Sequence, residues 1–185
     1  MTTLVDEFLP SPDFREKHTI TIAAPTYAVW TACQHLDLRD IRLARPLIAI
    51  RDVIARLRNG QSQRDMPTPD NMTRLAEEFH REIVNGLVGQ WWKFGASNNH
   101  VVQSTQEFQD FSEPGYAKAT FSFLLEEDKR GVRLTTETRV LCLDDSTRRV
   151  MGRYWTLIRP FSGFIRQSML SSIRRRALDL TKDDK

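Results

Sequence analysis

The sequence predicts an α+β fold in which one long C-terminal helix lies across a curved antiparallel sheet. The helix is indicated by apolar residues at helical spacing, namely Val150, Met151, Tyr154, Trp155, Ile158, Phe161, Ile165 and Met169. A strand precedes it, since side chains alternate and one face holds Val132, Leu134, Thr136, Thr138, Val140 and Cys142. The order of elements, a strand and two helices followed by several strands and the long helix, is typical of an α+β arrangement.

A length of 185 residues suits one domain and is short for two. We expect an irregular leader over residues 1–14, one domain over residues 15–181 and a tail over residues 182–185. The two cysteines, Cys33 and Cys142, are far apart in the sequence and support neither a disulfide framework nor a redox motif.

The composition argues against export, membrane insertion and nucleic-acid binding. The N-terminus lacks the basic start and apolar run of a signal peptide, and no segment approaches the roughly 20 apolar residues that cross a bilayer. The net charge is only +3, and the basic cluster at residues 174–176 is expected near a helix C-terminus, where cations are favoured. No aromatic-interleaved basic surface accompanies it. We therefore expect a cytoplasmic protein without a nucleic-acid partner.

The first strand is predicted over residues 16–23, where apolar and polar side chains alternate. Pro25 then suits the first turn of a helix, because its ring fixes φ and its missing N–H costs nothing there. A second amphipathic helix follows Pro46 and ends near Gly60. Two short helices are thus expected after the first strand.

The middle of the chain is predicted to be a run of antiparallel strands. Residues 61–71 form a long connection, which is either a lid or binding loop or a disordered segment. Residues 73–79 are expected to form a short helix or turn. Gly86 and Gly89 indicate a bulge or bend in the next strand and not a phosphate loop. The strands are predicted over residues 82–92, 101–111, 117–126 and 132–143. Pro160 predicts a kink in the long helix.

Three blocks of residues carry a family resemblance that covers most of the chain. They are Glu82, Ile83, Val84, Gly86, Gly89 and Trp92; then Thr136, Glu137, Thr138, Arg139 and Val140; then Arg148, Arg149, Tyr154, Trp155, Ile158, Arg159, Pro160, Ser162, Ile165 and Arg166. In this pattern the sequence resembles the START-like superfamily, also called SRPBCC, which includes polyketide cyclase and dehydrase-type domains, and within it an uncharacterised bacterial branch. The resemblance implies a helix-grip fold with an apolar cavity between sheet and C-terminal helix. It implies no common reaction, because members include lipid carriers, cyclases, hydrolases and plain binding proteins.

We expect a ligand site on the sheet face toward the last helix, because ligand pockets are mostly apolar with a few placed polar groups. The same residues could instead form a solid core. Threonines on an inward face favour the cavity, since a buried hydroxyl needs a partner. Strand alternation directs one of Trp91 and Trp92 toward the cavity but does not decide which of the two. The family pattern favours Trp92. The predicted lining residues are Trp92, Phe121, Phe123, Leu134, Thr136, Thr138, Tyr154, Trp155 and Ile158.

No residue is assigned a catalytic, cofactor-binding or metal-binding role from the sequence. Glu137 is either a general base or part of an ion pair with Arg139, Arg149 or Arg153, and we expect the ion pair because catalysis needs a perturbed pKa and a substrate-facing geometry. The four histidines show no metal-ligand spacing, and no serine lies in a nucleophile motif.

Three functions are compatible with the sequence. The first is binding of a small hydrophobic molecule, such as a lipid, polyketide or aromatic metabolite, with Thr136, Thr138 and Tyr154 orienting its polar atoms. The second is a cyclase- or dehydratase-like enzyme that uses Glu137 or Tyr154 as acid or base. The third is a non-binding interaction module with a filled core, in which one tryptophan of the pair marks a homodimer surface.

Overall fold

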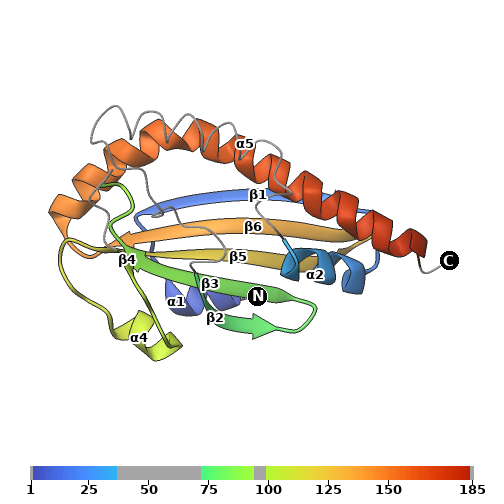
Figure 1. Cartoon of the computed structure of the whole chain (residues 1–185), viewed down its shortest axis with the longest axis horizontal. Helices are drawn as coiled ribbons and strands as arrows, with labels where there is room; N and C mark the ends of the chain where they lie inside the picture. Colours follow the sequence, from blue (N-terminus) through green and yellow to red (C-terminus); the bar gives the residue numbers. More distant parts are fainter. Residues whose placement is uncertain (1, 37–71, 94–98, 184–185) are drawn as a thin grey trace.

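The structure is a computed structural model that describes residues 2–36, 72–93 and 99–183. The helices and strands in chain order are α1 (Leu4–Phe8), β1 (Phe14–Ile22), α2 (Thr26–Gln34), β2 (Thr73–Glu78), β3 (Glu82–Gly89), β4 (Asn99–His100), α4 (Thr105–Asp110), β5 (Ala117–Asp128), β6 (Gly131–Cys142) and α5 (Asp145–Asp183). The strands form one antiparallel sheet in the order β1-β6-β5-β3-β2, with the short β4 paired to β3. Figure 1 shows α5 lying along this sheet.

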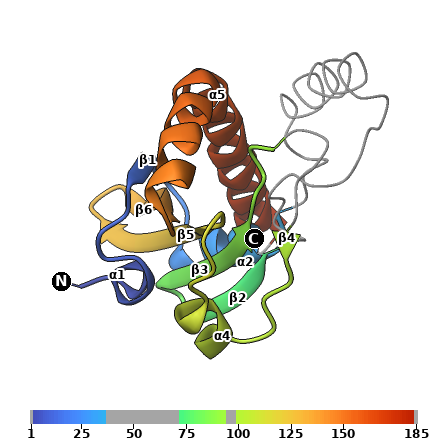
Figure 2. The ribbon, with the colours of Figure 1, turned by 90° about the vertical axis from the view of Figure 1, so that its left-hand side faces the viewer.

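The predicted α+β class, with a curved antiparallel sheet and a long C-terminal helix, is confirmed. α5 covers one face of the sheet, and α1 and α4 lie against the other (Figure 2). We call the face toward α5 the inner face and the opposite one the outer face. The helix predicted from Pro25 is α2, with Pro25 as its N-cap. The second predicted helix, after Pro46, and the connection over residues 61–71 lie outside the described residues.

Three local predictions differ from the structure. Residues 73–78, predicted as a helix or turn, form β2, because pairing with β3 overrides the helix propensity of their Leu, Ala and Glu side chains. The predicted strand over residues 101–111 contains α4, which begins at Ser104, whose Oγ accepts a hydrogen bond from the Glu107 N–H at 3.1 Å. The leader predicted to be irregular over residues 1–14 contains α1.

The two faces of the sheet bury different sets of apolar residues, as the alternation in β5 and β6 predicts. The inner face carries Ile20, Ile22, Ile83, Leu87, Ala117, Ala119, Phe121, Phe123, Leu125, Val132, Leu134 and Val140, which pack with α2 and α5. The outer cluster contains Val5, Leu9, Leu75, Val84, Val88, Val102 and Phe108, contributed by the sheet, α1 and α4. Both faces are therefore covered, and charged side chains on either face are taken out of water.

α5 continues through Pro160 and bends as it passes over the sheet (Figure 1). Pro160 lacks the N–H of a normal helical residue and crowds the preceding turn, so the bend agrees with the predicted kink. Met151 and Met169 are buried as predicted, whereas Val150 is 50% exposed. The buried stripe of α5 is thus narrower than the predicted one. The side chain of Phe161 is outside the described part of the chain.

Candidate functional site

The residues predicted to line a ligand site fall into two apolar clusters on the inner face. Phe121, Phe123 and Leu134 pack with Met169, Leu170 and Ile173 of α5. Trp92 belongs to a second cluster with Leu87, Ala117, Ala119, Val140 and Met151, against which Tyr154 and Trp155 pack. Ile158 is half-buried on α5. The structure therefore brings the predicted residues together as two groups, one toward each half of α5.

The two predicted threonines stand between these apolar clusters. Thr136 and Thr138 follow Leu134 along the inner face of β6, and the pairing with β1 places His18 beside Thr136 and Glu16 beside Thr138. Thr136 is completely buried, whereas Thr138 is half-buried. The hydroxyls that were predicted to orient a ligand thus lie next to two titratable side chains of β1.

α5 completes a buried polar group that the sequence analysis missed. The Glu16 carboxylate accepts a hydrogen bond from Ser162 Oγ at 3.1 Å and one from His18 Nε2 at 2.9 Å. Arg166 Nε lies 3.6 Å from Glu16 Oε2, and Arg166 Nη2 donates to Thr138 Oγ1 at 2.7 Å. We call Glu16, His18, Thr138, Ser162 and Arg166 the inner polar cluster.

The local geometry of α5 explains how this cluster forms. Ser162 and Arg166 are four residues apart and so share one face of the helix. Gly163 lies close to β1: a Cβ there would stand 3.8 Å from both Glu16 Oε1 and His18 Cε1. The available sequence signals were the i, i+4 spacing of Ser162 and Arg166 and the position of Glu16 on the His18 side of its strand. Nothing in the sequence joins the two segments, which are 146 residues apart.

Two buried polar atoms at this place have no hydrogen-bond partner among the described residues. They are Thr136 Oγ1 and Arg166 Nη1, and the exposed fractions of these residues are 0% and 9%. An unpaired buried polar group costs about 1–3 kcal/mol, so such groups are few in native proteins. Two other unpaired atoms, Thr120 Oγ1 and Trp30 Nε1, belong to the outer face and to α2. The inner face therefore holds unused hydrogen-bonding capacity close to predicted ligand-binding residues.

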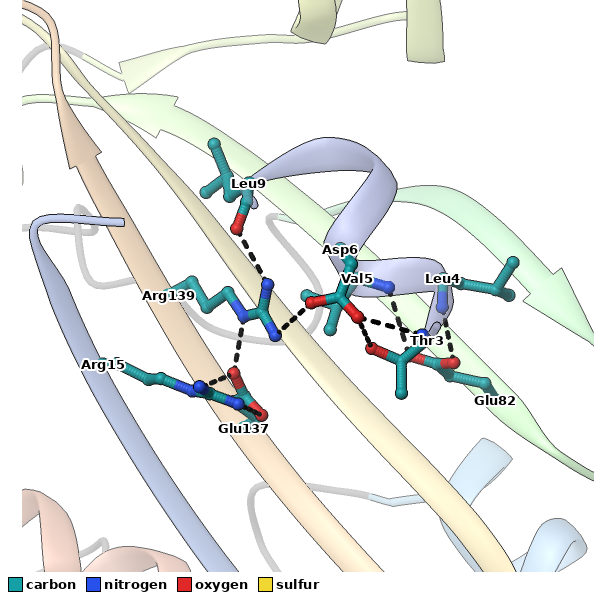
Figure 3. Close-up of polar contacts among 9 residues, drawn as sticks. All are labelled: Thr3, Leu4, Val5, Asp6, Leu9, Arg15, Glu82, Glu137 and Arg139. Carbon is teal, nitrogen blue, oxygen red and sulfur yellow. Dashed lines mark hydrogen bonds and ion pairs between the residues drawn. The ribbon is translucent and has the colours of Figure 1, made fainter. Parts of the chain in front are cut away.

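Glu137 lies on the outer face and is part of an ion-pair network, as predicted. Its carboxylate accepts a hydrogen bond from Arg139 Nε at 2.5 Å, and its second partner is Arg15, 2.6 Å away on β1, where the sequence analysis had proposed Arg149 or Arg153 (Figure 3). Burial acts to raise the pKa of Glu137, but the hydrogen bonds from Arg15 and Arg139 outweigh it and hold the pKa below its ordinary value. A carboxylate with a lowered pKa, directed away from α5, is unsuited to be the general base of an inner site.

The same outer network fixes α1 at both ends. The fully buried Glu82 carboxylate accepts the N–H groups of Leu4 at 2.7 Å and Val5 at 3.2 Å, at the N-terminus of α1. At the other end, Arg139 Nη1 donates to the Leu9 carbonyl at 2.8 Å (Figure 3). A negative charge at the N-terminus and a positive charge at the C-terminus both stabilise a helix. Glu82 and Arg139 therefore have a structural role on the outer face, where they stabilise the two ends of α1.

The two tryptophans after β3 are both buried. Trp91 is 8% exposed and Trp92 6%, they make an edge-to-face contact at 5.3 Å between ring centroids, and both belong to the inner apolar cluster around Met151. The strand was predicted to continue to Trp92, but β3 ends at Gly89, so strand alternation does not apply to the pair. The prediction that the two rings point in opposite directions is wrong.

A hollow of about 310 Å³ opens between α2 and the C-terminal half of α5, away from the inner polar cluster. Its lining is mixed, with Ala32, His35, Leu36, Ser172, Ile173, Arg175, Arg176, Asp179 and Leu180. None of the predicted site residues lines it. The predicted cavity under the middle of α5 remains a prediction.

The described residues contain no metal-ligand cluster of three or more His, Cys, Asp or Glu side chains. Ser162 contacts Glu16, and His18 contacts the same carboxylate, so the acid stands between the serine and the histidine. A nucleophilic serine needs a histidine at its hydroxyl, which is not the arrangement seen here. Cys33 is buried, and burial raises the pKa of its thiol, which opposes formation of a thiolate.

A scan of protein-family models and a search of curated proteins find no match to this chain. Similar solved structures include two di-domain ARO/CYC proteins: StfQ from the steffimycin biosynthetic pathway (11% identity, TM-score 0.46) and BexL from the BE-7585A biosynthetic pathway (12%, 0.39). They align with 91% and 92% of this chain, which spans about half of each, 52%. The hypothetical protein jhp0584 from Helicobacter pylori has 12% identity and a TM-score of 0.42, over 96% of this chain and 99% of its own.

These likenesses concern the arrangement of the chain and say nothing of what it binds. The fold itself has the features that the START-like resemblance implied, because a curved antiparallel sheet holds a long C-terminal helix against its inner face. Function has to be argued from the residues of the site.

Proposed function

We propose that this protein binds a small hydrophobic molecule, such as a lipid, polyketide or aromatic metabolite, between the inner face of the sheet and α5. The observation that carries the proposal is the Thr136 hydroxyl, which is completely buried and has no partner among the described residues. A core built for stability alone would carry Val at this position, since Val fills a similar space without a polar atom. A bound molecule with a polar atom would satisfy the hydroxyl.

The proposed site uses both apolar clusters and the polar residues between them. The body of the ligand would contact Trp92, Phe121, Phe123, Leu134, Trp155 and Ile158, and the hydroxyls of Thr136, Thr138 and Tyr154 would orient its polar atoms. Mostly apolar walls with a few convergent polar groups are the usual composition of small-molecule sites. Burial of the ligand's apolar surface would supply most of the affinity.

A second candidate function is an enzyme on the same fold, and one observation favours it. Glu16 and His18 are within hydrogen-bond distance of each other on the inner face, so an acid and a base converge beside the proposed site. The carboxylate is already engaged by Ser162 and lies 3.6 Å from Arg166, which leaves it less free to take a proton from a substrate. We therefore place binding before catalysis. The other predicted candidate, Glu137, lies on the outer face.

The described residues give less support to an interaction module. Trp91 and Trp92, which were expected to mark a homodimer surface if one turned outward, are both buried. Among the helices that the structure describes, none is long and apolar enough to span a membrane. A small hydrophobic molecule remains the partner that the inner face favours, and the homodimer stays a prediction.

Replacement of Thr136 by Val tests the proposal with a matched control. Because the hydroxyl has no hydrogen-bond partner among the described residues, Thr136→Val should raise the free energy of unfolding by about 1 kcal/mol while weakening the binding of polar ligands. Thr135→Val, one residue away, removes a hydroxyl that hydrogen-bonds to Thr19 at 3.0 Å and should lower stability by a similar amount. Urea unfolding measures both, and loss of stability in Thr136→Val would contradict the proposal.

Native mass spectrometry of the freshly purified protein gives an independent test, because a co-purifying ligand adds its mass to the chain. Titration with the neutral fluorescent probe N-phenyl-1-naphthylamine should show saturable binding at a single site. Absence of saturable binding, in a protein that unfolds cooperatively, would overturn the proposal.

A further inference from the structure

We propose that the ligand carries a neutral oxygen acceptor, such as a ketone, ester or quinone carbonyl, and that Arg166 anchors this oxygen through its unpaired Nη1. The inference rests on the proposed function and names the ligand chemistry of that same site. Arg166 thereby becomes the residue that distinguishes an oxygenated ligand from a plain hydrocarbon of equal size.

The contacts of Arg166 leave one end of its guanidinium unused. Nε lies 3.2 Å from Ser162 Oγ, Nη2 donates to Thr138 at 2.7 Å, and Nη1 has no partner in the part of the chain that the structure describes. The guanidinium carbon stands over the ring of Phe121, 5.6 Å from its centroid. Its plane is therefore fixed by three contacts, and the free N–H groups occupy a defined place next to an aromatic side chain of the predicted lining.

Burial makes this free end costly unless a ligand uses it. Arg166 is 91% buried by accessible area, and a guanidinium N–H that has lost water without gaining an acceptor costs more than a neutral group in the same position. A ligand oxygen would restore the missing bond. Because charge-assisted hydrogen bonds are about twice as strong as neutral ones, the gain in affinity should be large for one contact.

The charge balance of the cluster selects a neutral oxygen over a carboxylate. Glu16 already lies 3.6 Å from Arg166 Nε and provides one negative charge for one positive charge. A second buried carboxylate would face Glu16 across the same guanidinium, and an unpaired charge in a low-dielectric interior is expensive. A carbonyl oxygen accepts the same hydrogen bond without adding charge.

The inference predicts a rank order among three naphthalenes of nearly equal size. In displacement of N-phenyl-1-naphthylamine, 2-acetylnaphthalene should bind roughly tenfold more tightly than 2-isopropenylnaphthalene, the hydrocarbon of the same shape, and also more tightly than 2-naphthoate. In Arg166→Met the preference for the ketone over the hydrocarbon should disappear while the hydrocarbon still binds. Arg174→Met, at an exposed arginine of the same helix, should keep the wild-type order.

A double variant keeps the test valid if Arg166→Met does not fold. Glu16→Gln combined with Arg166→Met removes both charges of the pair, and such paired replacement is often neutral for stability. The infrared C=O stretch of bound 2-acetylnaphthalene should lie at lower frequency in the wild-type protein than in the double variant, because hydrogen bonding weakens the carbonyl bond. A purely structural role of Arg166 would not move this band.

The outcomes separate the two proposals. Equal binding of ketone and hydrocarbon by the wild-type protein overturns the role of Arg166 and leaves the hydrophobic site intact. Tighter binding of 2-naphthoate than of the ketone overturns the neutral-oxygen assignment. Failure of all three naphthalenes and of the fluorescent probe to bind overturns the proposed function itself.

Discussion

The stability that Glu82 gives this protein relative to Gln should decrease as the pH rises toward neutrality, although Glu82 makes two hydrogen bonds to the N-terminus of α1. Burial raises the pKa of Glu82, and the hydrogen bonds from the Leu4 and Val5 N–H groups offset this only in part. A carboxyl whose pKa is higher in the folded than in the unfolded chain is harder to ionise after folding. The stability that protonated Glu82 contributes is therefore fully present below the pKa of the unfolded chain. It is lost as the pH rises through the higher pKa of the folded protein.

The size of the effect follows from the same linkage. Each unit by which the folded pKa exceeds the ordinary value of 4.5 removes about 1.4 kcal/mol from the stability of the wild-type protein at neutral pH. Glu82→Gln does not ionise, but its amide nitrogen only donates, so one of the Leu4 and Val5 N–H groups loses its acceptor. Near pH 4 the variant should therefore be less stable than the wild-type protein by about 1–3 kcal/mol, and this difference should shrink as the pH increases. The pKa of the neighbouring Asp6 is about 2, so it titrates below this range.

Urea unfolding of both proteins between pH 4 and pH 7.5 measures the difference directly, because pH effects of the other groups cancel. Glu126→Gln is the matched control, since Glu126 is an exposed carboxylate paired with Arg133 on the same sheet, and it should change stability by less than about 0.5 kcal/mol. If the wild-type protein instead gains stability over Glu82→Gln as the pH rises, the helix dipole and the two amide hydrogen bonds outweigh burial, and the reasoning above is refuted.

Three other substitutions examine the network, the inner face and one turn. Glu137→Gln should lower the free energy of unfolding by about 3 kcal/mol in urea titrations, because the buried Arg139 keeps its charge beside a neutral partner. The Kd for N-phenyl-1-naphthylamine should stay the same, and a larger change in Kd than in stability would point to a ligand contact. Trp155→Ala should cost about 2 kcal/mol in thermal unfolding and weaken probe binding, since Trp155 stacks on a ring of β1; unchanged values would remove it from the inner face. Gly131→Ala should cost more than about 1 kcal/mol in urea, because its φ is +124° and a Cβ would overlap the Ile22 carbonyl, and wild-type stability would show that the turn relaxes.

The strands and helix with strong patterns were predictable from the sequence, because burial on one face imposes the pattern. In β5 apolar residues recur at every second position from Ala117 to Leu125, the alternation in β6 begins at Val132, and α5 repeats its apolar residues at helical spacing. The short elements were not. β2 is an edge strand whose composition favours a helix and whose conformation comes from pairing with β3. α4 has only six residues, and its one local signal was the cap at Ser104.

The site shows the same division between local and long-range information. Thr136 and Thr138 were predicted because polar side chains interrupt an apolar face of one strand. Arg166 was named only as part of the family resemblance and Glu16 not at all, because each alone is an ordinary charged residue, at the start of a strand or on a helix. Glu16 and Arg166 become a buried pair only because α5 packs against β1. The sequence alone does not show that these two distant segments are in contact.

The two buried arginines on opposite faces of the sheet show which polar group serves stability and which is available for function. Arg139 is 3% exposed, and each nitrogen of its guanidinium has a partner: Nε bonds Glu137, Nη1 bonds the Leu9 carbonyl and Nη2 pairs with Asp6 at 2.7 Å. Nothing is left for a ligand, and removal of Arg139 should only release α1. Arg166 is also buried, at 9% exposed, but its Nη1 has no partner among the described residues, and the same is true of the Thr136 hydroxyl on the same face of the sheet. The proposal therefore assigns the bound molecule to Arg166 and Thr136, whose unpaired atoms lie on the inner face, and assigns Arg139 a structural role only.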